Sequence, residues 1–507
     1  MKFNFLKRGT QLTTNHEGYT AYKLTPEMEL YTSVVTASLS DQFYEKGAEK
    51  LNRIRGLMAK TDPVFVAKLA VYAREKMYMR SIPMVLAVEL AKKHSGDALV
   101  SQTVGRVVQR ADEITELLAY YTMANERKET KKLHKLSKQV QKGLTTAFNR
   151  FDEYQFAKYD RKTAITLRDA LFLVHPKAKN EAQQELFNKI AKKELATPFT
   201  WETQLSAAGQ VKYANEEEKK KAFRDTWEAL IDSQDLGYMA LMRNLRNMLE
   251  AEISYEHIKD VCDLLSYPEA VRKSKQLPFR FLAAYRELRE VRHGMTGKVM
   301  EALEAALHAS IANLKGFNAN TRVVIACDVS GSMQRSVSAK SKILSYDIGL
   351  MLGMMLQSKC DNVMSGMFGD TWKVVNLPGK NILANIDAFY KREGEVGYST
   401  NAHLVLEDLV KRKYQADKIM FFTDCQMWST KHNTHINAMK QNWTAYKQLF
   451  PAAKLYLFDL AGLGHTPLSI EENDVHLISG WSDKVFEVME AIDKGQDALE
   501  HISAIQL

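Results

Sequence analysis

The stretch that most constrains the fold of this chain is the run from Val323 to Met333, VVIACDVSGSM. Its first five residues are apolar and mostly β-branched, which predicts a short strand buried in the middle of a parallel sheet. Asp328, Ser330 and Ser332 then place three oxygen-bearing side chains at alternate positions in a turn, where Gly331 supplies backbone freedom. Carboxylate and hydroxyl oxygens suit Mg²⁺, which leaves coordination positions for water or for a partner's acidic group.

Two later segments complement this turn. Residues 397–401, GYSTN, form a polar loop ahead of an apolar-periodic helix, and residues 418–424, KIMFFTD, read as a second buried strand that ends in a carboxylate. In a doubly wound sheet such strand ends gather at one edge, where ligands bind. The arrangement resembles the von Willebrand factor type A domain with its metal-ion-dependent adhesion site, and the resemblance implies the ligands Asp328, Ser330, Ser332, Thr400 and Asp424.

Two plainer interpretations of these residues stay open. Asp328 and Ser330 are also typical of residues that cap a following helix, although capping does not account for Thr400 and Asp424. Thr400 and Asp424 are also compatible with a purely structural role in a site that no metal occupies.

The length of 507 residues predicts more than one domain. From about Glu27 to His308, apolar residues recur at three- and four-residue spacing, which predicts antiparallel helix pairs stacked as a degenerate array of HEAT-type repeats. Residues 1–30 read as an irregular arm. After the polar segment 315–321, strands alternate with helices, which predicts a doubly wound α/β domain. We therefore expect a helical domain over residues 1–315 and an α/β domain over residues 316–507.

The positive charge of the chain lies in its N-terminal part. Residues 1–300 hold 50 Lys and Arg against 38 Asp and Glu, whereas residues 301–507 hold 20 against 23. A polyanion is therefore expected to bind the helical part. The sequence has no apolar run that approaches a membrane span and no signal-peptide pattern at its start, and its four cysteines are scattered. These features favour a reducing, cytoplasmic setting.

The clearest electrostatic feature is a predicted helix over residues 126–144. At about 100° per residue, its leucines and Val140 share one side and five lysines line the other: Lys128, Lys131, Lys135, Lys138 and Lys142. Lysines one turn apart suit a track of phosphates that is read without sequence specificity. An ordinary solvated helix face is the alternative.

A second basic cluster mixes cations with aromatic and imidazole groups, as contacts with RNA require. Its members are Lys158, Tyr159, Arg161, Lys162, Arg168, His175 and Lys177. His175 also fits the plainer role of a residue that caps the C-terminal end of a helix, because it follows an apolar run and precedes a proline.

Helical repeats joined to an adhesion-site domain resemble the Ro autoantigen family, whose repeat part is the TROVE domain. Residues 158–175, the helix from Tyr238 to Met248 and the start LPFRFL at Leu277 resemble family segments. The resemblance implies a ring that binds small structured Y RNAs on its outer surface and single-stranded 3′ ends of misfolded RNA in a central hole. It implies outer-surface contacts by Lys158, Lys162 and His175 and, near the hole, contacts by Arg243 and Arg246. It also implies a monomeric bacterial or phage version, with an exoribonuclease as a partner held through RNA.

No phosphate-binding loop, zinc-protease motif or serine-nucleophile elbow occurs in the sequence, so we do not expect an enzyme. The first functional hypothesis is therefore an RNA-binding protein of noncoding RNA metabolism. The second is a protein-interaction scaffold whose magnesium site captures an acidic protein partner. A metal-dependent nuclease is disfavoured, because the sequence places no general base beside the metal site.

Overall fold

The computed structural model describes residues 11–37, 45–125, 136–160, 162–276, 278–311, 317–337, 341–376, 378, 380–427, 435–470, 473–480, 484–496 and 499–507. Contacts group the chain into two compact units. The sheet unit comprises Met1–Leu57, Leu241–Glu250 and Ile258–Leu499, and the helical unit comprises Met58–Ala240, Ala251–His257 and Glu500–Leu507. The expected domain boundary between residues 315 and 316 lies outside the described residues and stays a prediction.

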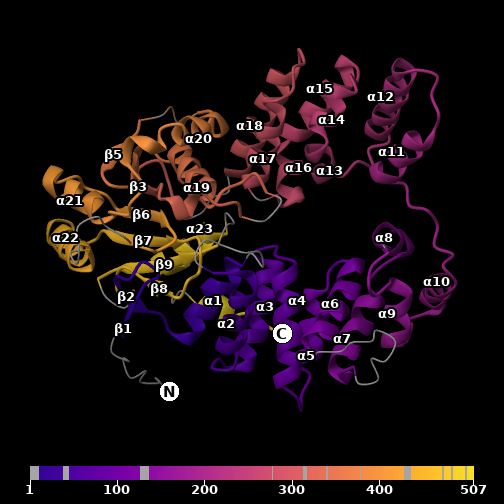
Figure 1. The fold of residues 1–507 in the computed structure, drawn as a ribbon, viewed down its shortest axis with the longest axis horizontal. Helices are drawn as coiled ribbons and strands as arrows, with labels where there is room; N and C mark the ends of the chain where they lie inside the picture. Colours follow the sequence, from indigo (N-terminus) through magenta and orange to yellow (C-terminus); the bar gives the residue numbers. More distant parts are fainter. Residues whose placement is uncertain are drawn as a thin grey trace. The chain divides into compact units, whose positions relative to one another are not determined.

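The core of the sheet unit is a six-stranded sheet in the order β5-β4-β3-β6-β7-β9 (Figure 1). All neighbours are parallel except β5, which pairs antiparallel with β4 at one edge. The bounds in chain order are β3 (Arg322–Asp328), β4 (Asn362–Phe368), β5 (Trp372–Val374), β6 (Lys418–Thr423), β7 (Lys454–Asp459) and β9 (Val475–Ser479). Because β4 and β6 flank β3 on opposite sides, the order of the strands reverses at β3, where α/β sheets bind ligands.

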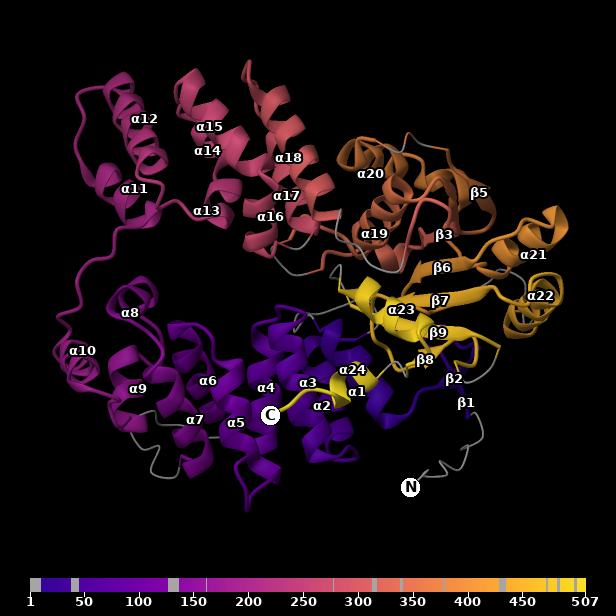
Figure 2. The same ribbon diagram turned by 180° about the vertical axis from the view of Figure 1, so that it is seen from behind.

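Helices cover both faces of this sheet. Figures 1 and 2 show α21 (His403–Arg412) and α22 (His435–Leu449) on one side, and α19 (Ser345–Lys359) and α23 (Val485–Asp493) on the other. Two glycines of α19 allow it to lie directly on the strands. A Cβ at Gly353 would stand 2.8 Å from Cγ2 of Ile325, and one at Gly349 would stand 2.8 Å from Cβ of Phe422. This close approach fixes the helix that follows the Asp328 turn.

The described start of the chain is ordered against the sheet unit, so the expected irregular arm is wrong there. β1 (Leu12–Thr14) and β2 (Thr20–Lys23) form an antiparallel hairpin, and β2 pairs with β8 (His465–Thr466). The helix α1 (Pro26–Val35) begins at Thr25, whose hydroxyl accepts a hydrogen bond from the N–H of Met28 at 3.3 Å. Local cap chemistry defines α1, whereas the hairpin depends on pairing with a strand over 440 residues away.

Further helices belong to the sheet unit in whole or in part: α2 (Gly47–Met58), α14 (Leu245–Glu250), α15 (Tyr255–Ser266), α16 (Pro268–Ser274), α17 (Pro278–Leu288), α18 (Thr296–Ile311) and α20 (Ile382–Tyr390). The helical unit contains α3 (Pro63–Glu75), α4 (Ser81–Lys93), α5 (Leu99–Val107), α6 (Ala111–Ala124), α7 (Lys138–Phe148), α8 (Glu153–Tyr159), α9 (Leu167–Val174), α10 (Glu181–Lys192), α11 (Trp201–Gln210), α12 (Glu216–Asp232) and most of α13 (Tyr238–Arg243).

Helices of the helical unit pack mainly on near neighbours in sequence. α3 lies against α4 and α5, α5 against α7, and α11 against α12. The short last helix α24 (Glu500–Ser503) returns to α3, as Figure 2 shows, where the rings of Tyr72 and His501 are 4.7 Å apart. Neighbour-to-neighbour packing is what helical repeats require.

Three expected helices differ in the structure. The helix expected over residues 238–250 breaks at Asn244, whose buried backbone carbonyl begins α14 by accepting from the N–H of Met248. Apolar spacing predicts one helix over residues 482–501, whereas the described part of this segment contains two, α23 and α24. Of the basic helix expected over residues 126–144, the described residues are helical from Lys138, Leu136 and Ser137 are not helical, and residues 126–135 lie outside the described residues.

The predicted fold class is confirmed: helices in the N-terminal part are followed by a doubly wound α/β sheet. Among the described helices, none combines the length and the apolar character that crossing a membrane requires.

Candidate metal centre and candidate RNA-binding surface

Asp328 is the last residue of β3 and lies at the point where the strand order reverses. In its buried carboxylate, Oδ1 accepts from the N–H of Ser330 at 2.9 Å and Oδ2 from Oγ1 of Thr423 at 2.6 Å. Ser330 precedes the short 3₁₀ helix Gly331–Gln334 but makes no side-chain cap bond to it. Its Oγ lies 3.2 Å from Oγ of Ser332 instead. The capping interpretation therefore does not explain the Ser330 hydroxyl.

Asp424 follows the end of β6, next to β3, and is 4% exposed. Its Oδ1 accepts from the N–H of Gln426 at 2.9 Å. Burial raises the pKa of Asp328 to about 7, with a further contribution from the charge of Asp424. Burial also raises the pKa of Asp424, opposed by a hydrogen bond from Ser332. The structure thus brings together Asp328, Ser330, Ser332 and Asp424.

Thr400 is buried on a loop that is fastened at the carboxyl end of β4, the other neighbour of β3. The loop needs glycine at Gly397, which has φ of 72° and whose Cβ would lie 2.0 Å from Oδ2 of Asp370. Asp370, just past β4, accepts from the N–H of Ser399 at 3.1 Å and from its hydroxyl. Among the described residues the structure shows no hydrogen bond between Thr400 and the other four predicted ligands.

The residues of this site suit a divalent cation. Asp328 and Asp424 are two buried carboxylates in mutual repulsion, and neither forms an ion pair with a cation of the described residues. The buried Oδ1 of Asn401, next to Thr400, also lacks a hydrogen-bond partner within the described part. A divalent cation would supply the missing positive charge and a coordination position for an acidic oxygen. The five sequence-predicted ligands are the residues that would hold it.

The described residues contain no cluster of three or more His, Cys, Asp or Glu side chains placed to hold a metal. The donor set at the strand ends depends on hydroxyl oxygens instead. Sequence reasoning missed three supporting residues, Thr423, Asp370 and Gln426, which hold Asp328, the Thr400 loop and Asp424. Asp370 carried a usable signal, because it follows a predicted strand end just as Asp424 does.

A buried lysine lies beside the next strand end. Asp459, the last residue of β7, is buried and accepts from the N–H groups of Ala461 and Gly462 at 2.9 and 2.8 Å. The ammonium of Lys50 donates to the carbonyl oxygen of Ala461 at 3.0 Å. Burial, ahead of the charge of Arg53, lowers the pKa of Lys50 to about 8. Lys50 therefore fastens α2 to the loop after β7.

Because the pKa of Lys50 is lowered to about 8 in the folded chain, the free energy of unfolding should increase with pH between about pH 8 and the ordinary lysine pKa of 10.5. In that range the unfolded chain binds a proton at this lysine that the folded chain does not, so raising the pH opposes unfolding. We expect the free energy of unfolding of the wild type to rise, relative to Lys50→Met, by up to about 1.4 kcal/mol per pH unit. Urea unfolding at several pH values measures this difference, and parallel profiles for the two proteins would contradict it.

Helices α8 and α9 carry exposed cations beside aromatic rings. Nζ of Lys158 lies 5.4 Å from the ring centre of Tyr154, and the guanidinium of Arg168 lies 5.6 Å from that of Phe172. These two rings are 45% and 51% exposed, which leaves them open to stacking partners. Lys162 is exposed as well, and Arg161 lies outside the described residues.

His175 caps the C-terminal end of α9, as the plainer interpretation expected. It has φ of 47°, and its N–H donates to the carbonyl oxygen of Leu171 at 2.9 Å. Its side chain is exposed, so the cap role leaves the imidazole accessible. A contact between His175 and RNA stays a prediction.

Only part of the predicted lysine track can be placed. Lys138 and Lys142 are exposed on α7, opposite the fully buried Val140 and Leu144. The other three lysines lie outside the described residues: Lys128, Lys131 and Lys135.

The two arginines assigned to single-stranded RNA differ in their surroundings. Arg246 pairs with Glu250 at 2.8 Å and with Glu287 at 3.5 Å. Partial burial lowers the pKa of Arg280, and the positive charge of the nearby Arg243 lowers it further. Arg243 and Arg280 both reach solvent, and neither of these two arginines forms a salt bridge within the described residues. An uncompensated arginine pair attracts anions, so Arg243 is better suited to a phosphate than Arg246.

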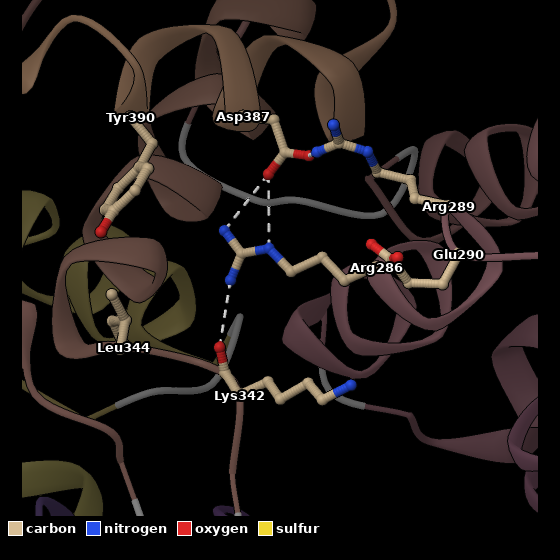
Figure 3. Close-up of a pocket in the computed structure, with 7 residues that line it drawn as sticks. All are labelled: Arg286, Arg289, Glu290, Lys342, Leu344, Asp387 and Tyr390. Atoms are coloured by element: carbon tan, nitrogen blue, oxygen red, sulfur yellow. Dashed lines mark hydrogen bonds and ion pairs between the residues drawn. The ribbon is translucent and has the colours of Figure 1, made fainter.

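A pocket of about 470 Å³ lies among α17, α20 and the segment before α19 (Figure 3). Its cations are already paired with carboxylates. Arg286 binds both carboxylate oxygens of Asp347, at 2.6 and 2.7 Å, and Asp387 at 3.3 Å, and Arg289 also contacts Asp387. This network joins α17 to α19 and α20. It leaves little uncompensated positive charge in the pocket to bind an anionic ligand.

Comparison with known proteins gives consistent matches. The TROVE domain family model matches residues 27–225 and 193–295, and the model of the Ro60 vWA domain matches residues 322–492. The crystal structure of the Deinococcus radiodurans RO (RSR) protein aligns with a TM-score of 0.61 and 16% identity, over 93% of this chain and 100% of that one. This likeness confirms the fold.

Two rodent proteins, each named telomerase protein component 1, also align with the chain. The Mus musculus protein is 25% identical over 342 residues, which is 51% of this chain. The Rattus norvegicus protein is 26% identical over 306 residues, or 47% of this chain. The aligned part covers 12% of the length of each rodent protein.

Proposed function

Because the chain belongs to the family that joins a TROVE domain to a Ro60 von Willebrand factor A domain, we propose that it binds small structured noncoding RNA of the Y type and the single-stranded 3′ ends of misfolded RNA. The family match over residues 27–295 carries the proposal, since it supports an RNA-binding, ribonucleoprotein function. Residues 1–300 hold 50 Lys and Arg against 38 Asp and Glu, whereas residues 301–507 hold 20 against 23, and this distribution agrees with a polyanionic ligand for the N-terminal part.

For structured RNA, the exposed surface of α8 and α9 is the proposed contact. Lys158, Lys162 and His175 are all exposed there, and Tyr154 and Phe172 offer half-exposed rings. Cations beside open rings suit a bent phosphate backbone with unpaired bases. Lys138 and Lys142 on α7 are proposed to add phosphate contacts that are independent of sequence.

For single-stranded 3′ ends, the proposed contact is Arg243, supported by its neighbour Arg280. Their mutual repulsion is relieved when an anionic phosphate binds between or beside them. Arg246 stays a weaker candidate, because Glu250 and Glu287 already compensate its charge. An exoribonuclease partner held through the RNA belongs to the same proposal.

A protein-capture role for the metal centre is the second function that a specific observation favours. Two buried carboxylates without a cationic partner among the described residues support a Mg²⁺ site at Asp328 and Asp424. We propose that this site takes an acidic oxygen as an additional metal ligand. RNA binding and metal binding use different residues, so the two functions are compatible.

A filter-binding titration of the full chain tests the RNA proposal. The probes are a structured RNA with a single-stranded 3′ tail, the same RNA with a blunt end, and duplex DNA, each at two salt concentrations. We expect the tailed RNA to bind about tenfold or more tightly than the blunt RNA, and every RNA affinity to fall with salt. Equal and weak binding of all three probes would contradict the proposal and leave protein capture as the leading function.

A further inference from the structure

Two exposed helix surfaces repeat one arrangement, in which a cation lies four residues from an aromatic ring. On α8, the ammonium of Lys158 lies 5.4 Å from the centre of the Tyr154 ring. On α9, the guanidinium of Arg168 lies 5.6 Å from the centre of the Phe172 ring. Side chains four residues apart are neighbours on one side of a helix, so each pair forms one small surface.

Each pair stands on a helix whose opposite side is fixed in the core. Phe156 of α8 and Val174 of α9 are fully buried. The N-terminal ends of the two helices are capped by side-chain oxygens of Asp152 and Thr166, each of which accepts from a backbone N–H. The rings are therefore presented by an ordered backbone, which lowers the entropy cost of binding a ligand against them.

The two cations carry charge that no carboxylate compensates. Within the described residues, neither Lys158 nor Arg168 forms a salt bridge. Each of the two helices has one carboxylate, and it is engaged elsewhere: Glu153 pairs with Lys189 at 2.6 Å, and Asp169 accepts hydrogen bonds at the start of α9. A cation and a ring side by side suit the phosphate and the base of a nucleotide, provided that the base is unpaired.

The ring of Tyr159, also on α8, has a different role. It is half-buried, and the guanidinium of Arg110 lies 4.3 Å from its centre. Arg110 is in turn bound to both carboxylate oxygens of Asp112, at 3.1 and 2.8 Å. These contacts join Tyr159 to the start of α6. Tyr154 and Phe172, which are 45% and 51% exposed, keep open area for a ligand.

We propose that Tyr154 and Phe172 are stacking platforms for unpaired RNA bases, beside which Lys158 and Arg168 hold the phosphates. The inference rests on the proposed RNA-binding function and names the part of the RNA that α8 and α9 select. Cations alone attract any polyanion, whereas a ring stacks only on a base that is not enclosed in a double helix. The two rings therefore discriminate between RNA with unpaired nucleotides and fully paired RNA.

Filter binding of the full chain to two blunt RNA duplexes tests this inference. One duplex is fully paired, and the other has the same ends and an internal bulge of unpaired nucleotides. We expect the double variant Tyr154→Leu with Phe172→Leu to bind the bulged duplex about tenfold or more weakly, and the paired duplex less than about threefold more weakly. Leucine keeps an apolar side chain but has no π face. Because no cation is removed, the salt dependence of binding should stay unchanged.

The matched control is Phe199→Leu in the same helical unit. Phe199 is 47% exposed, much like the two proposed platforms, but no cation of the described residues lies over its ring. We expect Phe199→Leu to leave the affinity for both duplexes unchanged. A second double variant, Tyr154→Trp with Phe172→Trp, keeps a π face at each position and should bind the bulged duplex as tightly as the wild type.

A fluorescent base provides a readout that a merely structural role would not change. With 2-aminopurine in the bulge, we expect the wild type and the tryptophan variant to quench its fluorescence by stacking, and the leucine variant to quench it less. Equal losses of affinity for the two duplexes, or a leucine variant that binds and quenches like the wild type, would overturn the inference. A wild type that binds neither duplex would overturn the RNA-binding function itself.

Discussion

Replacing Asp328 by asparagine is expected to weaken Mg²⁺ binding at least about 100-fold. The carboxylate is buried at the end of β3 and held by Ser330 and Thr423, so no solvent-exposed group can take its place. An amide keeps the size and the acceptor oxygen but loses the charge that a hard divalent cation needs. Calorimetric titration with Mg²⁺ measures the loss directly.

The matched control for this change is Asp361→Asn. Asp361 is exposed and directly precedes β4. It therefore lies at the amino ends of the parallel strands, whereas the predicted metal ligands lie at the carboxyl ends, so its replacement should leave Mg²⁺ affinity unchanged. Without metal, Asp328→Asn should be at least as stable as the wild type, because it removes one of two buried, mutually repelling carboxylates. Wild-type Mg²⁺ affinity in Asp328→Asn would rule out the site. Loss of RNA affinity as well would mean that the site supports the RNA-binding part.

The sheet and its strand-end residues could be predicted because their causes are local. Short β-branched runs define β3 and β6, and the polar residue after each strand lies at the ligand edge of any parallel sheet. Asp328 and Asp424 follow from this rule alone. By contrast, Thr400 needed a family resemblance, since its loop is placed by Asp370 and by the backbone of Gly397.

The ordered N-terminal hairpin could not be predicted for a different reason. The strands of this hairpin, three and four residues long, carry little periodicity, and β2 pairs with β8 far along the chain. Nothing in the sequence near His16 indicates that its turn lies against Gln426, whose Oε1 accepts from the N–H of His16 at 3.0 Å. The basic helix was misjudged because amphipathic spacing continues through Leu136 and Ser137, whereas helix α7 begins only at Lys138. Periodicity indicates which face is buried but does not fix where a helix begins.

Replacing Lys158, Lys162 and His175 together by alanine is expected to weaken binding of structured RNA about 100-fold at low salt. Each side chain is exposed, and none of the three changes removes a buried contact, so the fold should persist. The backbone N–H that caps α9 at His175 remains after the side chain is removed. Because two lysine charges are lost, the slope of log affinity against log salt should become shallower by about two.

The chain offers a control of the same composition in Lys219, Lys220 and His257 of the same unit. These three lie beside carboxylates: Lys219 with Glu216, Lys220 with Glu252, and His257 with Asp232. Since the two lysine charges are already compensated by carboxylates and His257 is hydrogen-bonded, their replacement by alanine should change RNA affinity less than about threefold. Equal losses in the two triple variants would mean that net charge alone attracts RNA. A loss confined to Lys158, Lys162 and His175 would place the RNA contact on α8 and α9, where cations and open aromatic rings occur together.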